Sequence, residues 1–138
     1  LQEPKVFYYP GLPQRRFWTV EEFPWLQDML AFVPQMQAEL AAVIESGDAG
    51  FDPYVRHDPS RPAPANHLLG KADWSALHFW RDGAVVAENA LRCPATMAAL
   101  EHAPPPVIPG RSPNAHWSSL QPGTHIKPHS GMLNTRLI

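Results

Sequence analysis

The sequence predicts a mainly β domain with a few helices. The 138-residue chain contains 17 prolines, a density that interrupts long helices and favours turns and irregular connections. Several short apolar and aromatic runs lie beside Pro-Gly or Asp-Gly pairs, which are typical of turns between strands. A chain of this length is expected to form a single domain, here residues 1–138, with a substantial core.

The first part of the chain predicts a short strand followed by a short helix. Residues 6–9 are apolar and aromatic, and Pro10-Gly11 ends them in a turn. Residues 19–22 resemble a capping box, after which Pro24 is suited to the first turn of a helix.

The clearest predicted helix begins near Pro34 and ends at Gly47, which is a natural C-terminal cap. The helical spacing places four apolar residues on one face: Met36, Leu40, Val43 and Ile44. Residues 48–70 follow with four prolines and little periodicity. We expect a lid or substrate-binding segment there, or an irregular loop.

The second half predicts a hairpin, a helix and a second hairpin. Residues 77–80 and 84–86 flank an Asp-Gly turn, and Cys93-Pro94 opens a helix that runs to Leu100. Residues 116–121 are predicted to be a strand, and Pro122-Gly123 suits the centre of a type II turn. The chain is expected to be extended again over residues 125–136.

The bulk composition favours a protein of a reducing compartment, and we expect a cytoplasmic one. The net charge is −2 and the pI is about 6.4, with scattered basic residues, so neither nucleic acid nor an anionic membrane is the expected partner. No apolar run has the length of a membrane span. The single cysteine, Cys93, excludes an internal disulfide and is expected to pack as a small apolar residue.

Two histidines near the C-terminal end, His125 and His129, are the first candidates for metal binding. In extended chain they would lie roughly 13 Å apart at about 3.3 Å per residue. Bonds from a metal to imidazole are only about 2.1 Å long, so one metal cannot take both. His129 is the better candidate, because Lys127 stands two residues after His125 on the same face and would oppose a bound cation. Gly131 stands at the corresponding place after His129, where non-haem iron oxygenases often have a carboxylate.

A simple hairpin around Pro122-Gly123 would place His116 opposite His129, and Ser118 one diagonal step from His129. Ser118 is then a candidate to contact the carboxylate of a metal-chelating co-substrate, and His116 is a possible second ligand. Spacing alone favours a plain cross-strand histidine pair over a metal site. Arg136 is a candidate to bind a carboxylate, or is a surface arginine. The other four histidines are expected to have structural roles: His57, His67, His78 and His102.

The sequence resembles the aspartyl/asparaginyl β-hydroxylase family in several segments. These include FYYPG at residues 7–11, Phe79-Trp80 with Gly83, and Cys93-Pro94 with Thr96 and Leu100. The most specific segment is SSLQPGTHIKPHSG at residues 118–131, followed by Asn134 and Arg136.

The resemblance implies a double-stranded β-helix, or jelly roll, and an oxygenase dependent on Fe(II) and 2-oxoglutarate. It implies that His129 binds iron, that glycine at position 131 is a family trait, and that Ser118 contacts 2-oxoglutarate beside an aromatic residue matched by Trp80. Basic residues near Arg136 serve an acidic co-substrate or substrate in the family. The family's second iron histidine and its arginine for the distal carboxylate lie beyond Arg136, so we expect the jelly roll of this chain to be incomplete on its C-terminal side.

Several functions remain open at this point. The leading one is hydroxylation of an unactivated carbon in a small molecule or peptide that has an acidic or amide side chain. Halogenation is a variant of it, and a membrane-associated lipid hydroxylase of the same family is another possibility. The alternative from a different class is a non-catalytic jelly-roll module that binds metal, or an inactive fragment. The oligomeric state is not predicted.

Overall fold

The computed structural model describes residues 3–4, 7–15, 17–47, 50–60, 62–129, 131 and 133–134. The chain forms two compact units. One unit consists of Leu1–Pro24 together with His125–Ile138, and the other consists of Trp25–Thr124.

A four-stranded antiparallel sheet is the centre of the larger unit. Its strands are β1 (Asp52–Pro53), β2 (Trp74–Arg81), β3 (Ala84–Val85) and β4 (Ala115–Leu120). The long strand β2 pairs with all the others. Since β4 pairs with β2 along most of its length, the two short strands β1 and β3 share the other edge of β2. The position of every other strand in this sheet therefore depends on β2.

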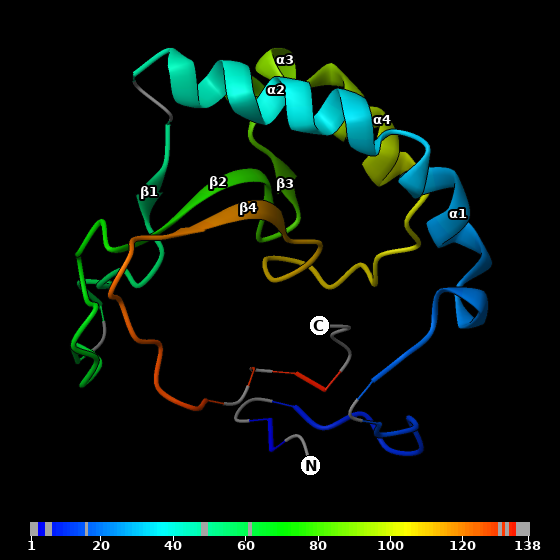
Figure 1. Ribbon diagram of the computed structural model, residues 1–138. Coiled ribbons are helices and arrows are strands. Elements are labelled where there is room, and N and C mark those ends of the chain that lie inside the picture. The colour runs from blue at the N-terminus through cyan, green and yellow to red at the C-terminus, as the bar shows by residue number, and fades with distance from the viewer. Residues whose placement is uncertain are drawn as a thin grey trace. The chain divides into compact units, whose positions relative to one another are not determined.

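The described residues form the 3-10 helix η1 (Val20–Glu22) and the α-helices α1 (Pro24–Leu30), α2 (Val33–Glu45), α3 (Ala87–Arg92) and α4 (Pro94–Glu101). Within the larger unit, α2, α3 and α4 lie together over the sheet (Figure 1). The core between them consists of Val43, Leu77, Phe79 and Cys93, each at most 3% exposed. The prediction that Cys93 packs as a small apolar residue is confirmed.

Local turn and cap signals predicted several elements correctly. The Asp-Gly hairpin is confirmed, with Asp82 at φ 53° and Gly83 at φ 89°, the left-handed region that a type I′ turn requires. Pro24 begins α1, Pro34 lies in the first turn of α2 and Pro94 begins α4, as predicted. Gly47 follows α2 with a φ of 75°, as expected for a C-terminal cap.

The predicted apolar face of α2 is partly wrong. Val43 is buried, but Ile44 is 60% exposed. Glu39 faces inward instead, because its carboxylate accepts hydrogen bonds from the backbone N–H groups of Ala95 (2.6 Å) and Thr96 (2.9 Å). The Thr96 hydroxyl also donates to it, at 2.7 Å. These groups lie at the N-terminus of α4, where backbone N–H groups lack helical partners and favour a negative charge.

The predicted hairpin between residues 116–121 and 125–136 is also wrong in its second strand. The turn is as predicted, with Gly123 at φ 81° and a hydrogen bond of 3.1 Å from the Thr124 N–H to the Gln121 carbonyl. However, none of the described residues from 125 to 134 belongs to a strand ladder. Strand β4 pairs with β2 instead. Pro128 explains part of the difference, because proline has no N–H to donate to a ladder.

In the smaller unit, Asn134 connects two segments that are distant in sequence. Its side-chain amide donates to the Tyr9 carbonyl at 2.9 Å, and its side-chain oxygen accepts from the Tyr9 N–H at 2.6 Å. An isolated parallel bridge between Phe7 and Leu133 lies beside these bonds. Phe7 is thus in a single bridge rather than in the strand predicted over residues 6–9, of which Val6 lies outside the described residues.

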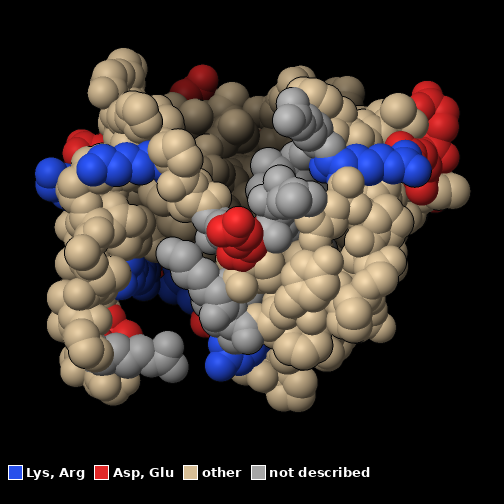
Figure 2. Space-filling model, turned by 90° about the horizontal axis from the view of Figure 1, so that it is seen from below, with Lys and Arg blue, Asp and Glu red and all other residues tan. Residues whose placement is uncertain are grey.

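The element types agree with the sequence prediction, since an antiparallel sheet is combined with a few helices. The double-stranded β-helix remains a prediction. Positive and negative side chains are interspersed with uncharged ones on the face seen in Figure 2. Among the described residues, no helix has both the length and the apolar character needed to cross a membrane.

The contact between Glu39 and α4 predicts a specific loss of stability. Glu39→Ala removes an acceptor of three hydrogen bonds, and we expect the free energy of unfolding to fall by about 2 kcal/mol in urea titrations. Glu45→Ala is the matched control, because Glu45 is exposed at the end of the same helix. Equal stability losses in the two variants would contradict the role assigned to Glu39.

Candidate active site

Strand alternation gathers polar and aromatic side chains on the sheet face opposite the helices. We call this the histidine face and define it by Trp74 and His78 of β2 and His116 and Ser118 of β4. In the β2–β4 register His116 lies opposite His78, and Ser118 lies opposite Ala76. The intervening Leu77 and Trp117 point the other way, Leu77 in the core and Trp117 packed against it, so these four share one side of the sheet.

Trp74 and Ser118 are joined directly. The indole Nε1 of Trp74 donates to the Ser118 hydroxyl oxygen at 3.0 Å. An indole N–H can only donate, so the serine oxygen is the acceptor, and its own O–H can donate to a further group such as a carboxylate. The side chain predicted to contact a co-substrate is therefore held in a defined orientation.

Tyr54, just after β1, packs against Trp74 and His116. Its ring stacks on that of Trp74 with centroids 4.2 Å apart and an interplanar angle of 26°. The His116 ring lies 5.3 Å away on a tilted plane. The backbone N–H of Tyr54 donates to the Trp74 carbonyl at 2.9 Å, which fixes the tyrosine beside β2.

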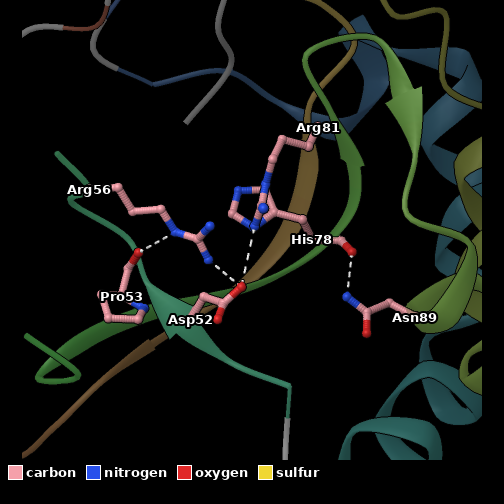
Figure 3. A network of polar contacts seen from close by, with 6 residues as sticks. All are labelled: Asp52, Pro53, Arg56, His78, Arg81 and Asn89. Carbon is pink, nitrogen blue, oxygen red and sulfur yellow. Dashed lines mark hydrogen bonds and ion pairs between the residues drawn. The ribbon is translucent and has the colours of Figure 1, made fainter. Parts of the chain in front are cut away.

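His78 lies beside a charged network in which Asp52 interacts with both Arg56 and Arg81 (Figure 3). The Arg81 guanidinium approaches His78 Nδ1 at 2.8 Å and the Asp52 carboxylate at 3.7 Å, and Arg56 forms an ion pair with Asp52. A guanidinium can only donate, so Nδ1 of His78 is the acceptor and the neutral ring carries its proton on Nε2.

The surroundings of His78 lower its pKa to about 4. Burial is the largest cause, and the positive charge of Arg81 is next. His116 and Arg56 lower the pKa further, while Asp52 opposes them. The ring of His116 lies 4.9 Å from that of His78. At neutral pH, His78 is therefore an uncharged hydrogen-bonding group.

The other aromatic candidate, Trp80, lies further along β2. It pairs with Val85 of β3 and with Ala115 of β4, beyond an irregularity in the ladder after His78. The residue that hydrogen-bonds Ser118 is Trp74, which the sequence interpretation did not single out. Strand alternation places Trp74, Ala76 and His78 on one face of β2. This alternation identifies Trp74 as a neighbour of Ser118 only when the pairing of β4 with β2 is known.

His129 belongs to the smaller unit, and its ring orientation suits metal binding. Its Nδ1 lies 2.9 Å from the backbone carbonyl of Lys127. A carbonyl can only accept, so Nδ1 carries the proton and the lone pair of the neutral ring is on Nε2. Metal-binding histidines commonly have this arrangement, with one ring nitrogen bonded to a carbonyl and the other directed to the metal.

The donor set around His129 is small. In the part of the chain that the structure describes, no three His, Cys, Asp or Glu side chains come together as a metal site. Gly131 is described, and it supplies no side-chain ligand. Arg136, predicted to bind a carboxylate, lies outside the described residues. Among the described residues, His129 is therefore not part of a group of three such side chains, and its metal role remains a prediction.

The sequence is similar to one family of known proteins. A sequence model described as Aspartyl/Asparaginyl beta-hydroxylase matches residues 32–138. The match includes the histidine face and His129. No solved structure matches the chain.

The environment of His78 predicts its titration. Its ordinary pKa is 6.5, and its folded pKa is about 4. As the pH falls from 6.5 to about 4, His78 takes up a proton in the unfolded chain but not in the folded chain. The free energy of unfolding therefore decreases as the pH falls through this window. Arg81→Met is expected to raise the pKa of His78, because it removes the nearest positive charge.

NMR titration of the imidazole carbon-bound protons measures this pKa. Arg92→Met is the control, because Arg92 is on α3 and that helix packs against β2 from the other side. A pKa of His78 that stays at about 4 in Arg81→Met would show that the guanidinium has no influence on it.

Proposed function

The chain belongs to the aspartyl/asparaginyl β-hydroxylase family, and from this premise we propose that it is an oxygenase dependent on Fe(II) and 2-oxoglutarate. The family supports a hydroxylase function. The observation that carries the cofactor proposal is the His129 ring, whose Nδ1–H is engaged by the Lys127 carbonyl at 2.9 Å and whose Nε2 has the lone pair.

His129 is the residue that would hold the iron, through Nε2. A single described ligand, with glycine at position 131, leaves coordination positions for co-substrate, oxygen and further groups. When bound, Fe(II) with 2-oxoglutarate and O2 supplies an oxidation in which one oxygen atom enters a substrate C–H bond and the other enters succinate, with release of CO2. The Lys127 carbonyl keeps the imidazole in the tautomer that this role needs.

Ser118 and Trp74 are proposed to bind the co-substrate. The Ser118 O–H would donate to a carboxylate of 2-oxoglutarate while its oxygen accepts from the indole of Trp74 at 3.0 Å. Trp80 is the alternative aromatic residue proposed to lie beside the co-substrate, as the family resemblance implies. Arg136 is proposed for a second carboxylate, of co-substrate or substrate.

The family also suggests a protein or peptide substrate, and we propose one with an aspartyl or asparaginyl side chain. The jelly roll belongs to the same proposal, with the sheet of β1 to β4 as a part of it. A cytoplasmic location and the choice of hydroxylation over halogenation remain predictions.

The iron role of His129 is tested by His129→Ala in the intact protein. We expect Fe(II)-dependent formation of succinate from 2-oxoglutarate to fall by more than about 100-fold, since even loss of a group that hydrogen-bonds a metal ligand costs about 10- to 100-fold in metal affinity or activity. His125→Ala is the matched control and should retain activity, because it is four residues away and outside the proposed site. Undiminished turnover in His129→Ala would exclude this ligand, and no turnover in the wild type would favour a non-catalytic module.

The co-substrate role of Ser118 predicts a change in KM. Loss of a hydrogen bond to a charged group in Ser118→Ala is expected to raise the KM for 2-oxoglutarate about tenfold or more. Ser119→Ala is a close control, because it removes the neighbouring hydroxyl on the other side of β4. If both variants keep the wild-type KM, Ser118 does not bind the co-substrate.

A further inference from the structure

Tyr54 packs against the indole of Trp74, which hydrogen-bonds Ser118. It stacks on the indole at 4.2 Å, nearly parallel, and reaches the His116 ring at 5.3 Å. Its contacts thus extend from β2 to β4, the two strands that carry the histidine face.

The backbone around Tyr54 makes this position firm. The Tyr54 N–H donates to the Trp74 carbonyl at 2.9 Å, continuing the pairing of β1 with β2. The next residue, Val55, accepts from the Gly70 N–H at 2.9 Å, which closes the proline-containing segment between them. The tyrosine is therefore held at both its backbone and its ring.

The direction of the Trp74 N–H depends on the torsion angles of its side chain. A ring stacked on one face of the indole limits the rotations that would turn Nε1 away from the Ser118 oxygen, 3.0 Å distant. Since Ser118 accepts this hydrogen bond, the direction in which its own O–H can donate depends on Trp74. A restraint on the indole is thus transmitted to the serine hydroxyl.

We propose that Tyr54 is a positioning residue for the binding of 2-oxoglutarate, acting through Trp74 on Ser118. The inference rests on the proposed function, because it assumes that Ser118 binds the co-substrate. Under this proposal, Tyr54, the first residue after β1, sets the geometry of the hydrogen bond from the Ser118 hydroxyl to a carboxylate of 2-oxoglutarate. Tyr54 itself need not touch the co-substrate.

Tyr54→Leu tests the proposal, because it keeps an apolar side chain and removes the stacked ring. We expect the KM for 2-oxoglutarate to rise about five- to tenfold while kcat at saturating co-substrate changes by less than about twofold. The dissociation constant of 2-oxoglutarate, measured by calorimetry with Mn(II) in place of Fe(II), should rise by the same factor. Tyr54→Phe retains the ring and should restore wild-type values.

A control variant at a distant site separates an effect on co-substrate binding from a general loss of stability. Val43→Ala removes a buried core group on α2, so it lowers stability without touching the histidine face, and its KM for 2-oxoglutarate should be unchanged. If Tyr54→Phe has a KM raised as much as Tyr54→Leu, or if neither variant changes the KM of an active wild type, the inference is overturned. If the wild-type protein itself neither binds nor consumes 2-oxoglutarate, it is the proposed function that fails.

Discussion

The pairing of β2 with β4 is the constraint on which the larger unit depends. It runs from Trp74 opposite Leu120 to Trp80 opposite Ala115 and joins segments about forty residues apart in the sequence. One side of this ladder supplies the core beneath the helices. The other side supplies the histidine face. A shift of the register by one residue would exchange the two sides, burying His116 and Ser118 and exposing Trp117.

The parts of the fold that could be predicted are those set by neighbouring residues. A left-handed turn at Asp82-Gly83 and a helix start at Pro94 depend only on local backbone preferences. The β2–β4 ladder depends on residues far apart, whereas the hairpin predicted across Pro122-Gly123 joins near neighbours. That hairpin would place His116 opposite His129 rather than opposite His78, and it gives no role to Trp74. The ring tautomer of His129 depends on the position of a carbonyl, which the sequence does not reveal.

The histidine face is rich in donors yet contains a histidine that stays neutral. His78 is beside Arg81, and the guanidinium uses its ring as an acceptor, so protonation of that ring would place two positive charges in contact. Asp52 interacts with both arginines of the network. With His78 neutral, the two arginines and the one aspartate leave this network with a net charge of +1.

The hydrogen bonds between Asn134 and the backbone of Tyr9 join residues separated by 125 positions. The unit that contains His129 is thus made from the two ends of this sequence, with the whole of Trp25–Thr124 between them. Closing so long a connection carries an entropic cost that grows slowly with length, but it delays the contact kinetically. The imidazole proposed to bind iron therefore lies in a unit that is complete only after a contact across 125 positions has formed.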